Sequence, residues 1–322
     1  MSYSSITVTP EQPNIGATIS DVDLNNPSSP IVYEEIREAL LEHGVVFFRD
    51  QNLTPEAHVK LANALGLPET HEFFPSVPNH KEISIISMDD NVDKEIGQNG
   101  TDRWHADVTF RPDPSFASIL RGVDIPFGGD TMWVNMNAAY ESLPAKIKTL
   151  LEGLDADHDG LADAQLRAYI LEQKGPDGLA EFAKHRPPHK HPVVIAHPLT
   201  GKPILYVNSI WTQRLNGLPE DLAQSVLSWL FELPKVPEFQ VRFKWEPNSV
   251  VIWDNFLTQH YAVNDYKDYR EMQRVVISGY EPRAYNNTTS SLGQSPSFLD
   301  GNKVERMDIQ QQTAIKQLFA SV

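Results

Sequence analysis

The chain has 322 residues, 40% of them hydrophobic, and a formal net charge of −16 at pH 7. This composition permits a sizeable core and argues against a nucleic-acid backbone or an anionic membrane as the main partner, because both carry negative charge. Since the chain has no cysteine, disulfides and thiolate ligands are excluded, and a bound metal ion would need His, Asp or Glu.

The N-terminal stretch MSYSSITVTP shows no secretory signal pattern, and no apolar run approaches the ~20 residues that cross a bilayer. We therefore expect a cytoplasmic protein. Further along, apolar spacing in 33–44 predicts a helix that a glycine can end, and VVFFRD (45–50) predicts a short buried strand. A second helix is predicted over 54–66, which begins with Thr and Pro and ends in Gly.

Short β-rich segments separated by turn signals dominate the rest of the chain. Many short strands joined by turns are typical of a closed or double-sheet β architecture. Helical stretches near 138–153 and 219–232 interrupt this pattern. The predicted strands are 83–87, 116–122, 131–134, 192–197, 203–208, 250–253 and 274–280.

The segment 155–191 is rich in Asp, Gly, Pro and His and has weak periodicity, which predicts a long, lid-like insertion that serves as a mobile cover. Its first residues, DADHDG (155–160), resemble the start of a calcium loop. The twelfth position is Leu166 instead of the required Glu, so we do not predict a calcium site. We interpret EGLDADH (152–158) as a solvated turn. With no internal repeat and no clear linker, we predict a single domain over 1–322.

The stretch WHADVTF (104–110) places His105 and Asp107 two positions apart. In a strand these side chains would project from the same face and could bind one metal ion. A strand-end histidine hydrogen-bonded to a nearby carboxylate explains the pair equally well. A mononuclear ferrous site would need a third ligand. The candidate is His260, which follows the buried strand 250–253, the residues WDN and a loop.

This order of elements resembles the taurine dioxygenase/TfdA family of iron(II)- and 2-oxoglutarate-dependent dioxygenases. The resemblance runs from about residue 6 to about residue 283 and implies a mainly β fold with flanking helices around a double-stranded β-helix (jelly-roll, cupin-like) core. It also implies that homo-oligomers, dimers or tetramers, are to be considered. The matching blocks are NIGATISDVDL, VVFFRDQNLTPE, WHADVTF, GGDTMW, HPVVIAHPLTGKPILYVN, EFQVRFKWEPNSVVIWDN and TQHYAVNDY.

The resemblance implies that His105, Asp107 and His260 bind Fe(II) at the catalytic centre and leave three positions for 2-oxoglutarate and O₂. It also makes Arg270 and Thr131 the residues that bind the far carboxylate of 2-oxoglutarate. An arginine suits a desolvated carboxylate because it can pair in bidentate geometry. Without the resemblance, Thr131 would be an ordinary strand threonine and Arg270 a surface ion-pair residue.

Arg274 matches the arginine that holds a sulfonate, sulfate or carboxylate in family members, which implies a small anionic organic substrate. His71 falls where the taurine enzyme has a substrate-contacting histidine, although a surface loop histidine is an equal alternative. Phe74 replaces a tyrosine of that enzyme, Thr101 replaces an asparagine, and Gly160 stands where it has a phenylalanine wall. These departures favour a less polar or larger substrate than taurine.

The expected reaction is oxidation of a substrate C–H bond, with release of succinate and CO₂ from 2-oxoglutarate. Two alternatives remain at this point. One is a β-barrel protein that binds a small anion without turnover. The other is a zinc hydrolase, since two histidines and a carboxylate also suit Zn²⁺. Against hydrolysis, no general base is evident beside the three residues.

Overall fold

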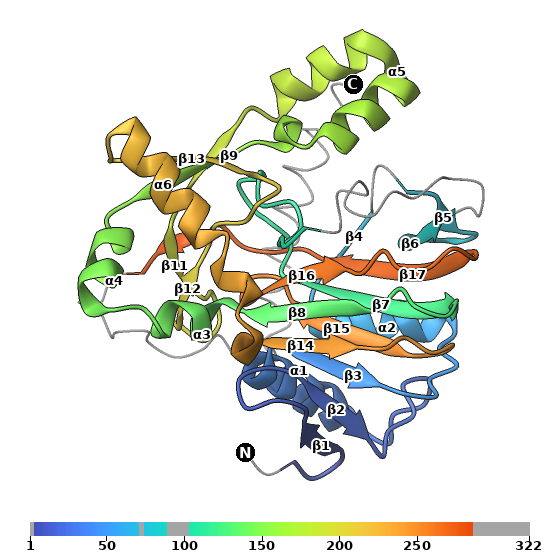
Figure 1. The fold of residues 1–322 in the computed structure, drawn as a ribbon. Coiled ribbons are helices and arrows are strands. Elements are labelled where there is room, and N and C mark those ends of the chain that lie inside the picture. The colour runs from blue at the N-terminus through green and yellow to red at the C-terminus, as the bar shows by residue number, and fades with distance from the viewer. Residues whose placement is uncertain (1–2, 71–73, 89–102, 286–322) are drawn as a thin grey trace, which may run out of the picture. The chain divides into compact units, whose positions relative to one another are not determined.

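The computed structural model describes residues 3–70, 74–88 and 103–285, and two facing β-sheets form its core (Figure 1). In the larger sheet all neighbouring strands run antiparallel except the parallel pair β2 and β3. In spatial order its strands are β1 (Thr7–Pro10), β2 (Ala17–Ser20), β3 (Val45–Phe48), β15 (Val250–Asp254), β7 (Ala117–Asp124), β17 (Arg270–Ile277), β6 (His80–Met88) and β5 (Ser76–Val77), and β4 (Pro68–Glu69) also pairs with β17.

The smaller facing sheet consists of β14 (Gln240–Phe243), β8 (Thr131–Asn135) and β16 (Thr258–Ala262). Aromatic side chains from the two sheets meet between them: the rings of Trp133 and Trp253 lie 5.9 Å apart, and Phe47 stacks on Phe243 at 4.5 Å. Large rings of this kind bury much apolar area and dominate core energetics. The packing confirms the predicted mainly β, jelly-roll core.

The outer face of the large sheet is covered by two helices, α1 (Ile31–His43) and α2 (Pro55–Leu65), which contact its strands (Figure 1). Both predicted helices are confirmed, and α1 begins two residues earlier than expected. The N-cap of α2 is Thr54, whose hydroxyl accepts from the Ala57 N–H, an arrangement that satisfies a backbone donor at the helix start. Gly44 ends α1 at φ +76°, where a glycine fits without strain.

The pH dependence of the free energy of unfolding should reveal the titration of His58, a fully buried residue of α2. Burial lowers its pKa to about 4 from 6.5, although its Nε2 lies 3.3 Å from the Ile119 carbonyl oxygen. Because the unfolded chain takes up this proton first, the contribution of His58 is complete above pH 6.5 and is lost as the pH falls toward 4.

We expect acidification from about pH 7 to about pH 5 to lower the free energy of unfolding by ~2 kcal/mol more in the unaltered chain than in His58→Gln. Glutamine keeps an N–H donor at this position but does not titrate. Urea denaturation of the metal-free proteins at both pH values measures the difference. Identical pH slopes for the two chains would contradict this prediction.

The remaining helices and small sheets lie beside the sandwich. The predicted helix 138–153 is two helices, because Pro144 interrupts it. The predicted helix 219–232 is confirmed as α6. These elements are α3 (Met136–Glu141), α4 (Ala145–Glu152), α6 (Glu220–Leu230), the 3₁₀ helices η1 (Gly160–Ala162), η2 (Leu233–Lys235) and η3 (Pro237–Phe239), and the sheet of β12 (Pro203–Leu205), β11 (Val194–Ala196) and β18 (Arg283–Ala284).

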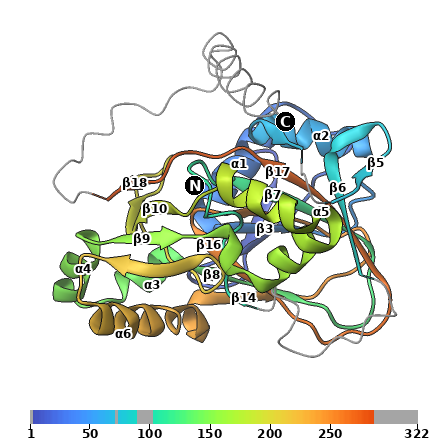
Figure 2. The same ribbon diagram turned by 90° about the horizontal axis from the view of Figure 1, so that it is seen from above.

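The segment 155–191 has more regular structure than its weak periodicity predicts. It contains β9 (Asp155–His158), α5 (Ala164–His185) and β10 (His189–Pro192), and β9 lies between β10 and β13 (Thr212–Asn216). The predicted solvated turn at 152–158 is therefore wrong for its second half, since β9 buries alternate side chains. α5 bends at Gly175, which has φ +68° and precedes Pro176. Figure 2 shows α5 above the strands of the sandwich.

All described residues belong to one compact unit. The single domain over 1–322 and the lid role of 155–191 remain predictions. In the part of the chain that the structure describes, no helix combines the length and apolar character needed to span a membrane.

Candidate active site

Three residues from distant parts of the chain converge at one point. His105, Asp107 and His260 each offer one ligand atom, and these atoms lie within 4.8 Å of one another. The Oδ1 atom of Asp107 is 3.9 Å from Nε2 of both histidines. Both imidazoles are buried, and their ring centroids are 4.1 Å apart. Two imidazole nitrogens and one carboxylate oxygen thus face a common centre, as a divalent metal ion requires.

The two histidines are held by each other's backbone. His105 and His260 form an isolated antiparallel bridge with hydrogen bonds of 3.1 Å and 2.7 Å in the two directions. His260 lies in β16, a strand that was not among the predicted ones, whereas the sequence suggested only that His260 follows a loop. The strand predicted through His105 and Asp107 is not formed. Instead, Asp107 begins a turn in which Val108 has φ +49°. The pair therefore converges through a turn instead of through alternation along a strand.

Both imidazole rings can donate a nitrogen lone pair to a metal ion. Burial lowers the pKa of His105, and burial together with His105 lowers the pKa of His260 to about 3. Both rings are therefore neutral near pH 7. Nδ1 of His105 lies 2.7 Å from the Arg103 carbonyl oxygen. This contact requires a proton on Nδ1, so Nε2 of His105 is left as the metal-binding atom.

Arg274 lies next to His105, Asp107 and His260, the candidate metal-binding group. Its Nη1 atom is 3.4 Å from Oδ2 of Asp107, whereas Oδ1 of the same carboxylate faces the two histidines. The Arg274 side chain is only 12% exposed. The guanidinium also lies over the ring of Phe74 at 5.7 Å. The structure thus brings two of the predicted substrate residues together beside the three converging side chains.

Arg270, on the large sheet, reaches the chain just before Thr131, on the facing sheet. Nη2 of Arg270 donates to the Gly129 carbonyl oxygen, two residues before Thr131, at 3.0 Å. Arg270 is the first residue of β17 and only partly exposed, whereas the sequence suggested a solvated stretch. Thr131 is buried in β8 and its hydroxyl accepts from Trp245 Nε1 at 2.9 Å. That hydroxyl can still donate its own proton to an anion.

Several buried donors on β8, β15 and β17 have no acceptor among the described residues. Among the described residues, the Nε atoms of Arg270 and Arg274 and the indole Nε1 atoms of Trp133 and Trp253 are buried and have no hydrogen-bond partner. Unpaired buried donors are expensive and uncommon. The two donors on arginines are favourable partners for carboxylate or sulfate oxygens.

The predicted residues His71 and Thr101 lie outside the described residues. Gly160 does not widen a substrate pocket, which corrects the sequence interpretation. A Cβ atom there would lie 3.1 Å from the rings of both Phe110 and Phe182. The rings of Phe110 and Phe182 occupy the space that the lack of a phenylalanine at position 160 was expected to leave open.

Sequence reasoning missed two residues that support the metal-binding group. Arg103 provides the carbonyl for His105 and pairs through Nη2 with Asp163, the N-cap of α5, at 2.5 Å. Asn255, in the WDN motif, binds the backbone of Asp107 with its side-chain amide. The position of Asn255 directly after a buried strand and shortly before His260 was the available signal.

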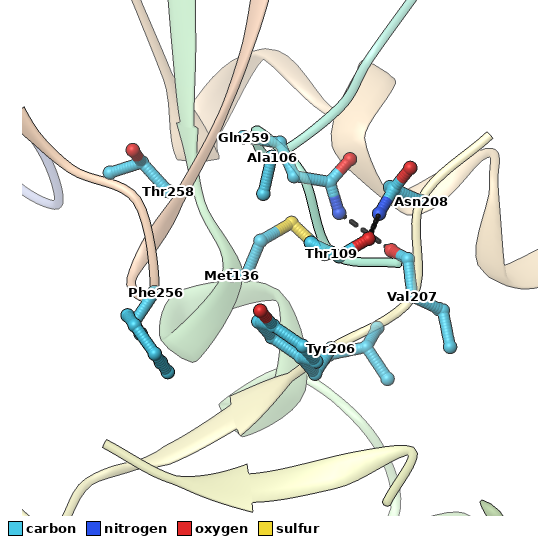
Figure 3. Close-up of a pocket in the computed structure, with 10 residues that line it drawn as sticks. Ala106, Thr109, Met136, Tyr206, Val207, Asn208, Phe256, Thr258 and Gln259 are labelled. Atoms are coloured by element: carbon cyan, nitrogen blue, oxygen red, sulfur yellow. Dashed lines mark hydrogen bonds between the residues drawn. The ribbon is translucent and has the colours of Figure 1, made fainter. Parts of the chain in front are cut away.

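A small cavity borders the same region (Figure 3). Its lining includes Ala106 and Thr109, on either side of Asp107, and Gln259, the neighbour of His260. Its volume of ≈ 10 Å³ suits about one water molecule and is too small for 2-oxoglutarate. The Tyr206 hydroxyl and Gln259 Oε1 are buried without partners among the described residues, and a water there would satisfy polar groups of this kind.

Comparisons with known proteins agree with this geometry. The chain is 38% identical over 269 residues to an alkylsulfatase from Acinetobacter baylyi, covering 82% of each chain. It is 35% identical over 279 residues to an alpha-ketoglutarate-dependent sulfate ester dioxygenase from Pseudomonas putida, covering 85% of this chain and 90% of the relative. A solved taurine dioxygenase from Burkholderia xenovorans superposes with a TM-score of 0.72 at 35% identity, covering 87% of this chain and 93% of that chain.

The family described as "Taurine catabolism dioxygenase TauD, TfdA family" matches residues 7–276, which include all three residues of the metal-binding group. These matches agree with the sequence resemblance and favour the oxygenase over the binding protein and the zinc hydrolase. The chain belongs to the TauD/TfdA family of 2-oxoglutarate-dependent dioxygenases.

Proposed function

We propose that the protein binds Fe(II) through His105, Asp107 and His260 and oxidises the carbon next to the oxygen of an alkyl sulfate ester. The observation that carries this proposal is the position of Arg274, a cation only 12% exposed and 3.4 Å from the metal-facing Asp107. An anionic head group held by that arginine would place its neighbouring carbon close to the metal-binding group.

The donor set fits ferrous iron. Two neutral imidazoles and one carboxylate are the facial donor set of non-haem Fe(II) oxygenases, and three protein donors leave positions for 2-oxoglutarate and O₂. Iron with these two reactants supplies the oxidant that attacks the C–H bond. The contribution of the protein is to orient the reactants and to exclude water.

Arg270 and Thr131 are placed to bind the C5 carboxylate of 2-oxoglutarate. The Arg270 guanidinium retains a buried Nε donor without a partner among the described residues, and the Thr131 hydroxyl has a free proton. A guanidinium and a hydroxyl can together bind both oxygens of a carboxylate. Their neighbourhood at the start of β8 favours one fixed orientation of the cosubstrate.

A sulfate ester is favoured over a sulfonate by the two named relatives and by the residues around Arg274. The ring of Phe74 covers one side of the guanidinium and is 38% exposed. It offers an apolar contact for an alkyl chain and no hydrogen-bond partner for an amine. Hydroxylation of the carbon that carries the sulfate would give an unstable product, which breaks its C–O bond to release sulfate and an aldehyde.

Arg274→Gln is expected to raise the KM for an alkyl sulfate by about 10- to 100-fold, because a charged hydrogen bond contributes ~1.5–3 kcal/mol. The KM for 2-oxoglutarate should change little. Steady-state kinetics with each reactant varied in turn measures both values. Arg274→Lys is the matched control, since it keeps the charge and should lose less. An unchanged KM for the alkyl sulfate in Arg274→Gln would contradict the role of this arginine.

The proposed substrate class is tested by substrate-stimulated release of succinate across alkyl sulfates, sulfonates, aryloxy acids and amino acids. We expect the highest kcat/KM with a linear alkyl sulfate, together with stoichiometric release of sulfate. Stimulation by a sulfonate or an aryloxy acid alone would refute the sulfate-ester assignment and leave the oxygenase chemistry intact.

A further inference from the structure

The backbone next to Asp107 is in an unfavourable conformation. Val108 has φ +49°, in the left-handed region that a β-branched residue rarely enters. Such a conformation persists only where the surroundings hold it, and residues of this kind cluster at active sites. The turn at Asp107 and Val108 must therefore be held by neighbouring groups.

The side-chain amide of Asn255 binds both backbone groups of Asp107. Its Oδ1 accepts from the Asp107 N–H at 2.7 Å, and its Nδ2 donates to the Asp107 carbonyl at 3.0 Å. Nδ2 also donates to the Ser115 carbonyl at 3.0 Å. Only one orientation of the amide satisfies two carbonyls and one N–H group. Asn255 is completely buried, so water does not compete for these bonds.

These bonds determine the conformation of Val108. The peptide plane between Asp107 and Val108 sets φ of Val108, and Asn255 holds the carbonyl of that plane. On the other side, the Arg111 N–H donates to the Val108 carbonyl at 2.9 Å. A rotation of Val108 to a common negative φ would turn the carbonyl of Asp107 away from Asn255.

We propose that Asn255 is a positioning residue that holds the Asp107 carboxylate between His105 and His260 against the strain at Val108. This inference rests on the proposed function, because it requires that the three residues bind Fe(II). Without Asn255 the backbone of Asp107 loses two buried hydrogen bonds. The turn then relaxes at Val108, and the carboxylate is displaced from its position.

Asn255→Ala is expected to weaken Fe(II) binding by about 10- to 100-fold, the range for partners that orient metal ligands. Anaerobic titration calorimetry measures this affinity, and circular dichroism verifies folding. The matched control is Asn135→Ala, which removes a buried amide that bonds Asn14, Asn137 and Ala138 but does not touch the Asp107 turn. It should keep the original Fe(II) affinity.

The coupling to strain is tested by a second substitution at Val108. Glycine adopts a positive φ at little cost, so Asn255→Ala with Val108→Gly should regain at least about threefold of the lost Fe(II) affinity. Alanine removes the same methyl groups but keeps the Cβ atom that causes the strain. Val108→Ala should therefore give no recovery in the same background.

If Asn255→Ala does not fold, Asn255→Asp provides the test, since it keeps the acceptor for the Asp107 N–H and loses the donor. An unchanged Fe(II) affinity in the Asn255 variant, or equal recovery by glycine and alanine, would overturn the inference. Absence of Fe(II) binding in the unaltered chain would overturn the proposed function and this inference together.

Discussion

Asp107→Ala is expected to weaken Fe(II) binding by more than about 100-fold and to abolish succinate release. Asp107 is the only carboxylate of the converging group, and its Oδ1 atom lies equally far from both imidazoles. Changes in residues that merely orient a ligand already cost 10- to 100-fold in affinity or activity, so loss of a ligand should cost more. The substitution also leaves Arg274 without its carboxylate neighbour. Anaerobic Fe(II) titration and a succinate assay measure the two effects.

The control is Asp113→Ala, which removes a carboxylate from the same part of the chain. Asp113 is 55% exposed and lies 3.6 Å from Arg111. Exposed ion pairs contribute little to stability, so we expect nearly unchanged Fe(II) affinity and turnover. Full Fe(II) affinity in Asp107→Ala would show that the metal ion is held elsewhere.

Arg270→Ala is expected to raise the KM for 2-oxoglutarate by about 30-fold or more. Truncation of one partner of a buried hydrogen-bonded charge pair costs ~2–5 kcal/mol, and each 1.4 kcal/mol corresponds to a factor of ten. The effect on the KM for the sulfate ester should be much smaller, because Arg274 and not Arg270 lies beside Asp107. Kinetics at saturating substrate and varied 2-oxoglutarate measures the change.

Arg270→Lys tests whether a positive charge alone is enough to bind the carboxylate of 2-oxoglutarate. Lysine keeps the charge but does not pair in bidentate fashion, so an intermediate KM is expected. Arg242→Ala is the matched control: Arg242 is 51% exposed and pairs with Asp130, next to Thr131, without reaching the buried donors. A KM for 2-oxoglutarate in Arg270→Ala equal to that of Arg242→Ala would contradict the assigned role.

Local sequence signals predicted every α-helix except α5, and about half of the strands of the two facing sheets. Thr54, Pro55 and Gly66 delimit α2 as expected, because caps and breakers act over a few residues. Apolar runs located β3, β6, β7, β15 and β17 of the large sheet but only β8 of the smaller sheet. The residue types of the metal-binding group were also readable, since few side chains suit Fe(II) when cysteine is absent.

The geometry of the site could not be predicted from local patterns. The strand β16 carries His260, and β17 begins at Arg270, four residues before the predicted strand. Polar residues that face a binding site interrupt the apolar pattern, so these strands resemble loops in the sequence. The turn at Asp107 depends on Asn255, 148 residues away in the chain. Such a contact appears only when the sandwich has formed.

The regular structure of the segment 155–191 could not be predicted from local sequence patterns either. Its Asp- and Pro-rich composition suggested little regular structure, yet β9 lies between two partner strands and α5 packs on a separate apolar cluster that includes Phe110. The turn that carries Asp107 thus contributes to the surface that holds α5. Tertiary packing here overrides a weak local preference.

In the proposed site, three protein side chains bind one ferrous ion and leave room for a bidentate keto acid. The most direct measurement is visible absorption after anaerobic addition of 2-oxoglutarate to the Fe(II)-loaded protein. We expect a weak charge-transfer band in the unaltered chain and none in Asp107→Ala. If the unaltered chain binds Fe(II) and 2-oxoglutarate yet shows no band, the keto acid does not reach the metal ion and the account is wrong.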